Sequence, residues 1–159
     1  MPSLPNMVSQ ALSRYRVPGN RLELEVTEGV FLGAENATLD TLKRLRALGV
    51  GIALDDFGTG YSSIGYLNKA VFHKLKIDGS FVREAGTRPE NVAIIQSIVQ
   101  LAKSFRMNVT AEGVETAEDF ERMRDLGVDT IQGYLFGRPL SYDRANQMVR
   151  GLDQQRKAG

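Results

Sequence analysis

Four acidic side chains stand out because each lies at the end of a short apolar or β-branched run: Glu25, Asp55, Asp56 and Glu112. Carboxylate oxygens are hard ligands that suit divalent cations such as Mg²⁺ and Mn²⁺. Asp55 and Asp56 are adjacent, and neighbouring like charges repel each other unless a cation neutralises them. The pattern therefore predicts a divalent-metal site. The alternative is a capped loop, because Asp also favours the start of a turn.

The composition narrows the kind of site. The chain has no Cys and a single His, His73. Disulfides, zinc–thiolate sites and thiol nucleophiles are therefore excluded, and a His-based triad is not expected. With oxygen ligands alone, Mg²⁺ or Mn²⁺ is favoured over zinc.

One cationic residue, Lys76, and one uncharged residue, Gln132, accompany the acids at strand ends. Lys76 shares one side of its strand with Asp78, and a Lys turned inward needs a carboxylate or phosphate partner. It could steady a phosphate or an attacking water, or belong to a structural Lys–Asp network. Gln132 could position a water or a phosphate oxygen, or be a satisfied core amide. Acids with a Lys suit phosphate-ester hydrolysis, in which two metal ions about 3.5–4 Å apart activate water and neutralise charge.

These residues belong to short strands that alternate with longer helical patterns, which indicates a parallel sheet. Glu23 lies deeper in the first strand than Glu25 and is expected to be paired or structural. Thr116 is the expected N-cap of the helix that follows the fourth strand, and Ser141 that of the last helix. The expected strands are 22–27, 50–56, 74–78, 108–112 and 130–135. The expected helices before the one capped by Thr116 are 6–15, 36–48 and 91–105.

A short internal repeat supports repeating β/α units. The sequence RALGV at 46–50 recurs as RDLGV at 124–128, each time where a helix ends at Gly and a strand begins. No Gly-x-Gly-x-x-Gly motif follows a strand, whereas polar residues gather at carboxyl ends of strands, where β/α barrels carry their sites. A closed barrel has eight strands in roughly 250 residues. The predicted fold class is therefore α/β, a (β/α) TIM-type barrel present as roughly its C-terminal five units.

Charge and hydropathy exclude other classes of protein. The formal net charge is +1, so no large basic field indicates a nucleic-acid partner. No apolar run approaches the ~20 residues of a membrane span, and the first residues lack a secretory pattern. A cytoplasmic location, alone or within a larger sensor protein, is the expectation.

Five runs, in this order and spacing, resemble the EAL-type cyclic di-GMP phosphodiesterase family: ELEVTE, ALDDFGTGYSS, KLKID, TAEGVET and QGYLFGRPLS. The resemblance covers about residues 4–152, so 1–159 is expected to be a partial EAL-type domain with a polar tail at 153–159. It implies a bacterial β/α barrel that hydrolyses cyclic di-GMP to linear pGpG with Mg²⁺ or Mn²⁺, two ions in the complete domain.

The resemblance also implies roles, residue by residue. The metal ligands are Glu25, Asp55 and Asp56. Three residues are implied to be catalytic. Lys76 orients the water, and Glu112 acts as general base or in metal coordination. Gln132 lies near the water.

Outside this group, Glu28 matches the residue that anchors the loop after the double Asp. That loop, expected to contact substrate and to take part in dimerisation and regulation, comprises Phe57, Gly58, Thr59, Gly60, Tyr61, Ser62 and Ser63.

The sequence departs from the family pattern in two places. The Glu-Ala-Leu segment and an early-strand Asn, both expected metal ligands, are not in these 159 residues. Residues 70–73 replace a usual Pro and Asp, which is expected to alter a loop rather than the site. The fragment is therefore expected to associate with its missing N-terminal half or to form a homodimer, and to hydrolyse cyclic di-GMP weakly or not at all. The alternative is a non-catalytic module that binds cyclic di-GMP or a protein.

Overall fold

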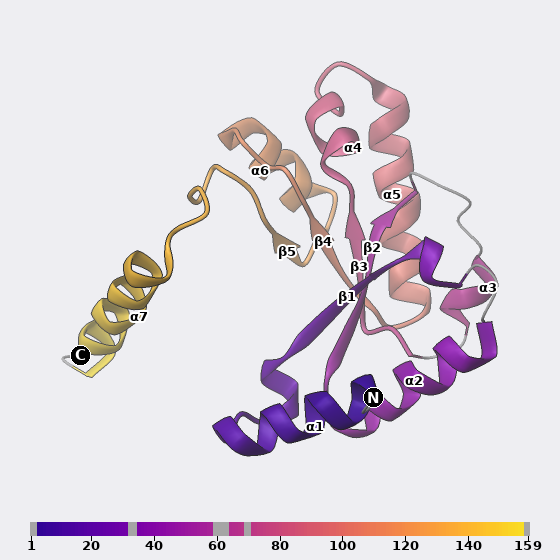
Figure 1. Ribbon diagram of the computed structural model, residues 1–159. Helices are drawn as coiled ribbons and strands as arrows, with labels where there is room; N and C mark the ends of the chain where they lie inside the picture. The colour runs from indigo at the N-terminus through magenta and orange to yellow at the C-terminus, as the bar shows by residue number, and fades with distance from the viewer. Residues whose placement is uncertain (1–2, 32–34, 59–63, 69–70, 158–159) are drawn as a thin grey trace.

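Five parallel strands form one sheet in which each strand pairs with the next along the chain (Figure 1). The computed structural model describes residues 3–31, 35–58, 64–68 and 71–157. The sheet confirms the predicted β/α alternation and matches five units of a β/α barrel. The strands are β1 (Glu23–Thr27), β2 (Gly51–Phe57), β3 (Lys74–Ile77), β4 (Asn108–Ala111) and β5 (Thr130–Ile131).

The helices between the strands cover one face of this sheet, and α5 packs directly on β3 and β4. None of the described helices combines the length and the apolar character needed to span a bilayer. The helices are α1 (Leu4–Tyr15), α2 (Glu35–Ala47), α3 (Ile64–Leu67), α4 (Gly79–Glu84), α5 (Pro89–Ser104), α6 (Ala117–Asp125) and α7 (Tyr142–Lys157), with 3₁₀ turns η1 (Gly19–Arg21) and η2 (Glu28–Phe31).

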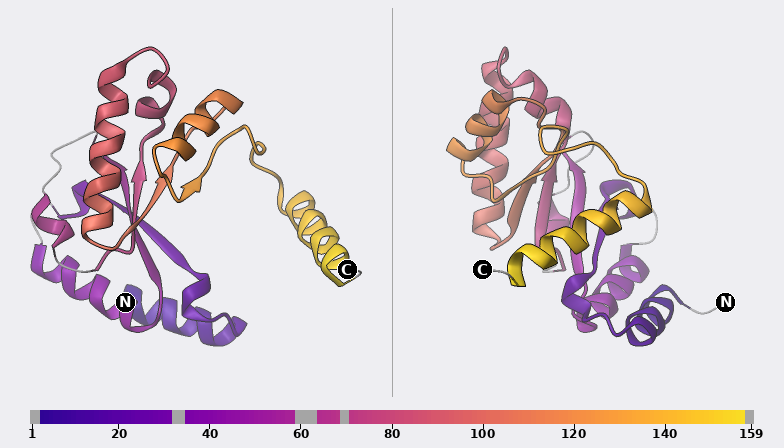
Figure 2. Two further views of the ribbon diagram at one scale, coloured as in Figure 1. Left: turned by 180° about the vertical axis from the view of Figure 1, so that it is seen from behind. Right: turned by 90° about the vertical axis from the view of Figure 1, so that its left-hand side faces the viewer.

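Three elements besides the 3₁₀ turns differ clearly from the sequence prediction: β5 and the unpredicted short helices α3 and α4. The last strand ends at Ile131 instead of residue 135, because the chain turns at Gly133, where a Cβ atom would lie 2.0 Å from the carbonyl oxygen of Val114. The short helix α4 was not predicted, since six residues are too few to show a helical period. The last helix, α7, was predicted, but it extends away from the sheet on an irregular connection (Figures 1 and 2).

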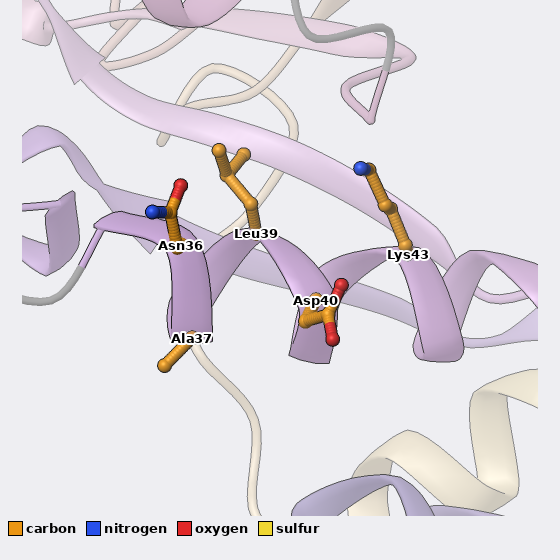
Figure 3. A pocket seen from close by; sticks show the side chains of 5 residues that line it. All are labelled: Asn36, Ala37, Leu39, Asp40 and Lys43. Atoms are coloured by element: carbon orange, nitrogen blue, oxygen red, sulfur yellow. The ribbon is translucent and has the colours of Figure 1, made fainter.

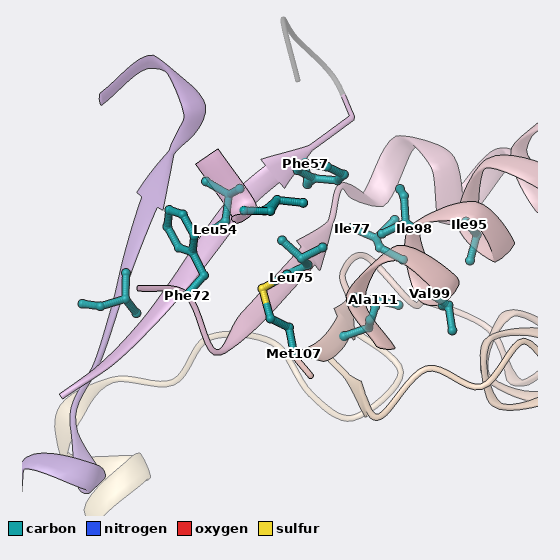
Figure 4. Close-up of a cluster of buried hydrophobic side chains, with 14 of the residues drawn as sticks. Leu54, Phe57, Phe72, Leu75, Ile77, Ile95, Ile98, Val99, Met107 and Ala111 are labelled. Carbon is teal, nitrogen blue, oxygen red and sulfur yellow. The ribbon is translucent and has the colours of Figure 1, made fainter. Parts of the chain in front are cut away.

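The core lies between the strands and the helix layer (Figure 4). Leu75 and Ile77 of β3 and Ile95 of α5 are fully buried. The opposite side of β1 carries Glu23 and Glu25, which are exposed while the residues between them are partly buried. This alternation places the polar side of the strand away from the helices.

The helix-to-strand joints share one backbone conformation. Gly49 and Gly127 both have positive φ, 84° and 80°, as predicted from the repeat. A third joint, after α5, has the same form with Arg106 at φ 57°, and Met107 N–H donates to the Ala102 carbonyl at 2.9 Å. These bonds are typical of helices that end in the left-handed region. Within the described residues, this conformation closes three helix-to-strand joints, of which the sequence repeat shows two. It also ends α1, where Arg16 has φ 54° and Val17 N–H donates to the Leu12 carbonyl at 3.0 Å.

Arg106→Gly is expected to stabilise the chain by about 0.5–1 kcal/mol. A non-glycine residue in the left-handed region carries a conformational free-energy cost that Gly does not carry. Gly gains only part of this free energy in stability, because the unfolded chain is more flexible at Gly. Urea unfolding measures the change, with Gly49→Ala as the reciprocal variant, since a Cβ there has no neighbour nearer than 3.6 Å and only φ is strained. A loss of stability in Arg106→Gly would contradict this account of the joint.

Candidate metal centre

The polar residues predicted at the strand ends meet at the carboxyl edge of the sheet. Parallel pairing sets Glu25 of β1 beside Ala53 of β2, and Thr27 beside Asp55. Lys76 of β3 lies beside Thr110 of β4, so Glu112 follows two residues further toward the carboxyl edge. Strand register alone therefore brings side chains from four strands to one edge.

Lys76 lies at the centre of this group. Its side chain is only 4% exposed, and its Nζ lies 2.7 Å from Glu25 Oε1, 2.7 Å from Glu112 Oε1 and 3.0 Å from Asp55 Oδ1. Burial by itself lowers the pKa of an ammonium, but the close carboxylates of Glu112, Glu25 and Asp55 raise the pKa of Lys76 above its usual range. The Lys is therefore a fixed positive charge shared by three strands.

The backbone of β2 brings the two adjacent acids together. Neighbouring residues of a regular strand point to opposite faces. Here the pairing register shifts between Leu54 and Phe57, and Asp56 adopts a positive φ of 54°, which Asp tolerates better than most residues. One carboxylate oxygen of each of Asp55, Asp56 and Glu112 consequently lies within 4.8 Å of the others.

This group of acids fits a divalent cation. Its donors are hard carboxylate oxygens, as Mg²⁺ and Mn²⁺ require. Asp55 Oδ1 is buried and has the ionic contact with Lys76 but no hydrogen bond of good geometry. Burial, followed by the charges of Asp55 and Asp78, raises the pKa of Asp56, so negative charge is in excess there despite Lys76. A bound cation would relieve that excess.

Other predicted site residues lie at the margin of the centre or beyond the described part. Gln132 follows β5 with an exposed side chain, and its backbone N–H donates to Ala111. The backbone of Glu28 begins η2, but its side chain is outside the description. Phe57 ends β2 and is buried in the core, and Gly58 follows at φ 98°. The rest of the predicted loop, Thr59, Gly60, Tyr61, Ser62 and Ser63, lies outside the described residues.

A hollow of about 360 Å³ opens beside the metal centre. It shares Glu112 with the centre, and Gln132 is on its wall. Its floor is formed by main chain, because Gly79 and Gly113 touch: a Cβ on Gly113 would lie 3.0 Å from the Cα of Gly79. The hollow is the natural extension of the site for a ligand larger than a metal ion.

Two other features are separate from the centre. At the opposite end of the strands Glu23 accepts from Lys74 at 2.9 Å and pairs with His73 Nε2 at 2.8 Å. Burial by itself raises the pKa of Glu23, but Lys74 and His73 lower this pKa below its usual value, as expected of a paired structural acid. A second hollow, of about 490 Å³, runs along α2 beside Asn36 and Lys43 and shares no residue with the metal centre (Figure 3).

Sequence reasoning missed Arg83. It lies on the wall of the 360 Å³ hollow, on the unpredicted helix α4. The one sequence signal was Asp78 followed by Ser80, since Asp78 accepts a hydrogen bond from Ser80 N–H at 2.9 Å and so caps α4.

Lys76→Met is expected to destabilise the chain by about 3 kcal/mol or more, because three carboxylates lose their shared cation. Mg²⁺ should then restore part of the stability, and raise the melting temperature more in Lys76→Met than in the unsubstituted chain. Thermal unfolding with and without MgCl₂ measures both effects. Lys74→Met is the matched control, because it removes a Lys of the same strand that pairs with the single acid Glu23. An equal Mg²⁺ response in both variants would show that the ion does not bind this group of acids.

Comparison with known proteins identifies the family of this chain. The family model described as EAL domain matches residues 1–139. The cyclic di-GMP phosphodiesterase RocR of Pseudomonas aeruginosa is 38% identical over 138 residues, which cover 87% of this chain and 35% of RocR. The chain spans between about a fifth and a third of the length of the curated relatives it matches, for example 18% of a protein of Sinorhizobium fredii.

Solved structures agree with the fold. A PaMucR phosphodiesterase in complex with c-di-GMP is 40% identical, with a TM-score of 0.81, and the match covers 87% of this chain and 56% of that one. The BlrP1 protein of Klebsiella pneumoniae, solved with manganese and cy-diGMP, is 32% identical, with a TM-score of 0.77 over 84% of this chain and 34% of that one.

Proposed function

We propose, from the fact that this chain belongs to the EAL domain family, that it carries part of the centre of a metal-dependent phosphodiesterase that hydrolyses cyclic di-GMP to linear pGpG. The observation that carries the proposal is the convergence of acids from three strands around Lys76. The relatives solved with cyclic di-GMP and with manganese support the choice of substrate and of Mg²⁺ or Mn²⁺ as cofactor.

The metal ligands are proposed to be Glu25, Asp55 and Asp56. Asp55 and Asp56 form the close group of acids with Glu112, and Glu25 reaches the same centre through its contact with Lys76. When bound, the ions, two in a complete domain, lower the pKa of water and neutralise charge on the phosphate. The adjacent carboxylates of Asp55 and Asp56 supply the charge that attracts these ions. Their backbone irregularity is the structural reason that both can face one site.

The remaining residues are proposed to act on water and phosphate. Lys76, held by its carboxylates, orients the attacking water with its ammonium. Glu112 Oε1 is 2.7 Å from that ammonium, which leaves Oε2 to take the proton from the water as general base. The amide of Gln132 hydrogen-bonds the water or a phosphate oxygen. Attack at phosphorus breaks the bond to the 3′ oxygen, because linear pGpG keeps its 5′ phosphate.

The whole chain, 1–159, is proposed to be part of one EAL-type domain, with Glu28 bracing the loop that begins at Phe57 and Gly58. In the described sheet β1 pairs only with β2, and β5 only with β4, so each has an unpaired edge. On α7, Met148 is 59% exposed. Open edges and exposed apolar side chains favour association with further β/α units or with a second copy. Cytoplasmic location and the lack of a nucleic-acid partner stay predictions.

Cation-dependent binding of cyclic di-GMP tests the site. The chain is expected to bind the nucleotide with Mg²⁺ present and to release it when the ion is chelated. Asp55→Asn should weaken binding by about tenfold or more, since even supporting residues of a metal site contribute 10–100-fold. Asp40→Asn on α2 is the control, because it makes the same change on an exposed helix surface. Binding that is weakened neither by the chelator nor by Asp55→Asn would overturn the proposal.

The same samples separate hydrolysis from binding alone. Release of pGpG by the 159-residue chain is expected to be slow or undetectable, because the sheet is open beside the site. Binding without turnover is therefore the second candidate function for this chain by itself. Fast Mg²⁺-dependent turnover that Asp55→Asn abolishes would contradict the expected weakness while supporting the catalytic assignment.

Analytical ultracentrifugation tests the open edges. The chain is expected to sediment as a species heavier than its 17.6 kDa monomer, through pairing at β1, at β5 or over α7. Met148→Lys should reduce the fraction of such species if α7 contributes, whereas Gln147→Lys makes a matched change at the neighbouring polar position. A monomer that unfolds in one cooperative transition would contradict this expectation.

A further inference from the structure

Arg83 is a cation that acts on Asp78 only through its charge, which adds to the Ser80 hydrogen bonds that lower the pKa of that acid. Arg83 has no hydrogen bond or ion pair to any described residue, whereas Arg88, Arg122 and Arg124 each pair with an acid. Its Nη1 lies over the touching glycines, 2.6 Å from where a Cβ on Gly79 would be and 2.8 Å from where one on Gly113 would be. The guanidinium therefore lies against the main chain of these two glycines, and its N–H groups have no hydrogen-bond acceptor among the described residues.

The hollow beside Arg83 is acidic and polar. Asp78, Glu112 and Glu115 line it, together with Gln132 and the ring of Tyr134. Its volume, about 360 Å³, is within the range of small-molecule sites. Since Glu112 also belongs to the metal centre, a ligand held at that centre reaches directly into the hollow.

The charges decide which part of a cyclic dinucleotide fits. One guanidinium among three carboxylates does not favour a phosphate anion there. A neutral base that both donates and accepts hydrogen bonds is favoured instead. Guanine presents O6 and N7, which Arg binds with two hydrogen bonds, and N1–H and N2–H₂, which a carboxylate accepts. Adenine presents its N6 donor beside N7 and would leave a guanidinium facing a donor.

Of the acids, Glu115 is the one available for a base. Asp78 Oδ1 already accepts from the amide and the hydroxyl of Ser80, and Glu112 Oε1 is held by Lys76. Glu115 is exposed and has no partner among the described residues. Tyr134 adds an aromatic ring. The Arg138 guanidinium lies over one side of it, 4.7 Å from the ring centroid, so a base can stack on the other side.

We propose that Arg83 and Glu115 select guanine, with the Arg83 guanidinium on O6 and N7 and the Glu115 carboxylate on N1–H and N2–H₂ of one base of the substrate. This inference rests on the proposed function for the identity of the substrate. It adds the residues that determine base specificity and places them in the hollow beside Glu112.

Titration calorimetry of the 159-residue chain with cyclic di-GMP and cyclic di-AMP, both in Ca²⁺, tests the assignment. Arg83→Met should weaken the binding of cyclic di-GMP by about 10- to 100-fold and leave the binding of cyclic di-AMP unchanged, as expected for the loss of one bidentate base contact. Arg83→Gln should shift preference toward cyclic di-AMP, because Gln pairs with N6 and N7 of adenine. Arg88→Met is the matched control, since it removes an exposed Arg five positions along the chain that does not line the hollow, and it should change neither affinity.

Other results would overturn the inference. An equal loss of affinity for both nucleotides would mean that Arg83 contacts phosphate or supports the fold. No loss of affinity would mean that Arg83 does not contact the nucleotide. In either case cation-dependent binding by the unsubstituted chain would leave the proposed function standing. Failure of the unsubstituted chain to bind either nucleotide would overturn the proposed function and the inference together.

Discussion

The site depends on one electrostatic constraint: acids from three strands converge on a small volume, and their repulsion must be balanced. Lys76 supplies the balance within the chain, with contacts of 2.7 to 3.0 Å to each of three carboxylates. Because Lys76 is almost fully buried, this balance operates where water screens little. The ammonium thus holds β1, β2 and β4 to a common centre before any metal ion arrives, and the excess charge around Asp56 is what remains for the ion.

The backbone provides the second condition. Parallel register places the strand ends level, but register alone would turn Asp55 and Asp56 to opposite faces. The irregularity of β2 after Leu54 and the left-handed conformation of Asp56 overcome this alternation. A conformational cost at one residue is therefore offset by the formation of a site, which is where such backbone strain is commonly found.

Much of this arrangement could be predicted from sequence, and the limits are specific. Helical periods and the Gly-ended joints predicted the parallel β/α order, since both are local signals. The site acids were predicted because charged residues ended apolar strands. The third joint was missed because Arg106 replaces the expected Gly. The shared contacts of Lys76 could not be predicted because folding brings together residues up to 87 positions apart in the sequence (25 to 112). Arg83 was missed because its significance comes from its surroundings: an Arg on a surface helix has no distinguishing sequence pattern.

The contact between Gly79 and Gly113 has a consequence for how the chain can vary. Because the start of α4 and the segment after β4 touch through main-chain atoms, the spacing between these two segments does not depend on any flexible side chain. A site built this way can change the groups that line its wall without changing its dimensions. Variation in ligand preference is thereby separated from the geometry of the reacting centre, so the one can diversify while the other is retained.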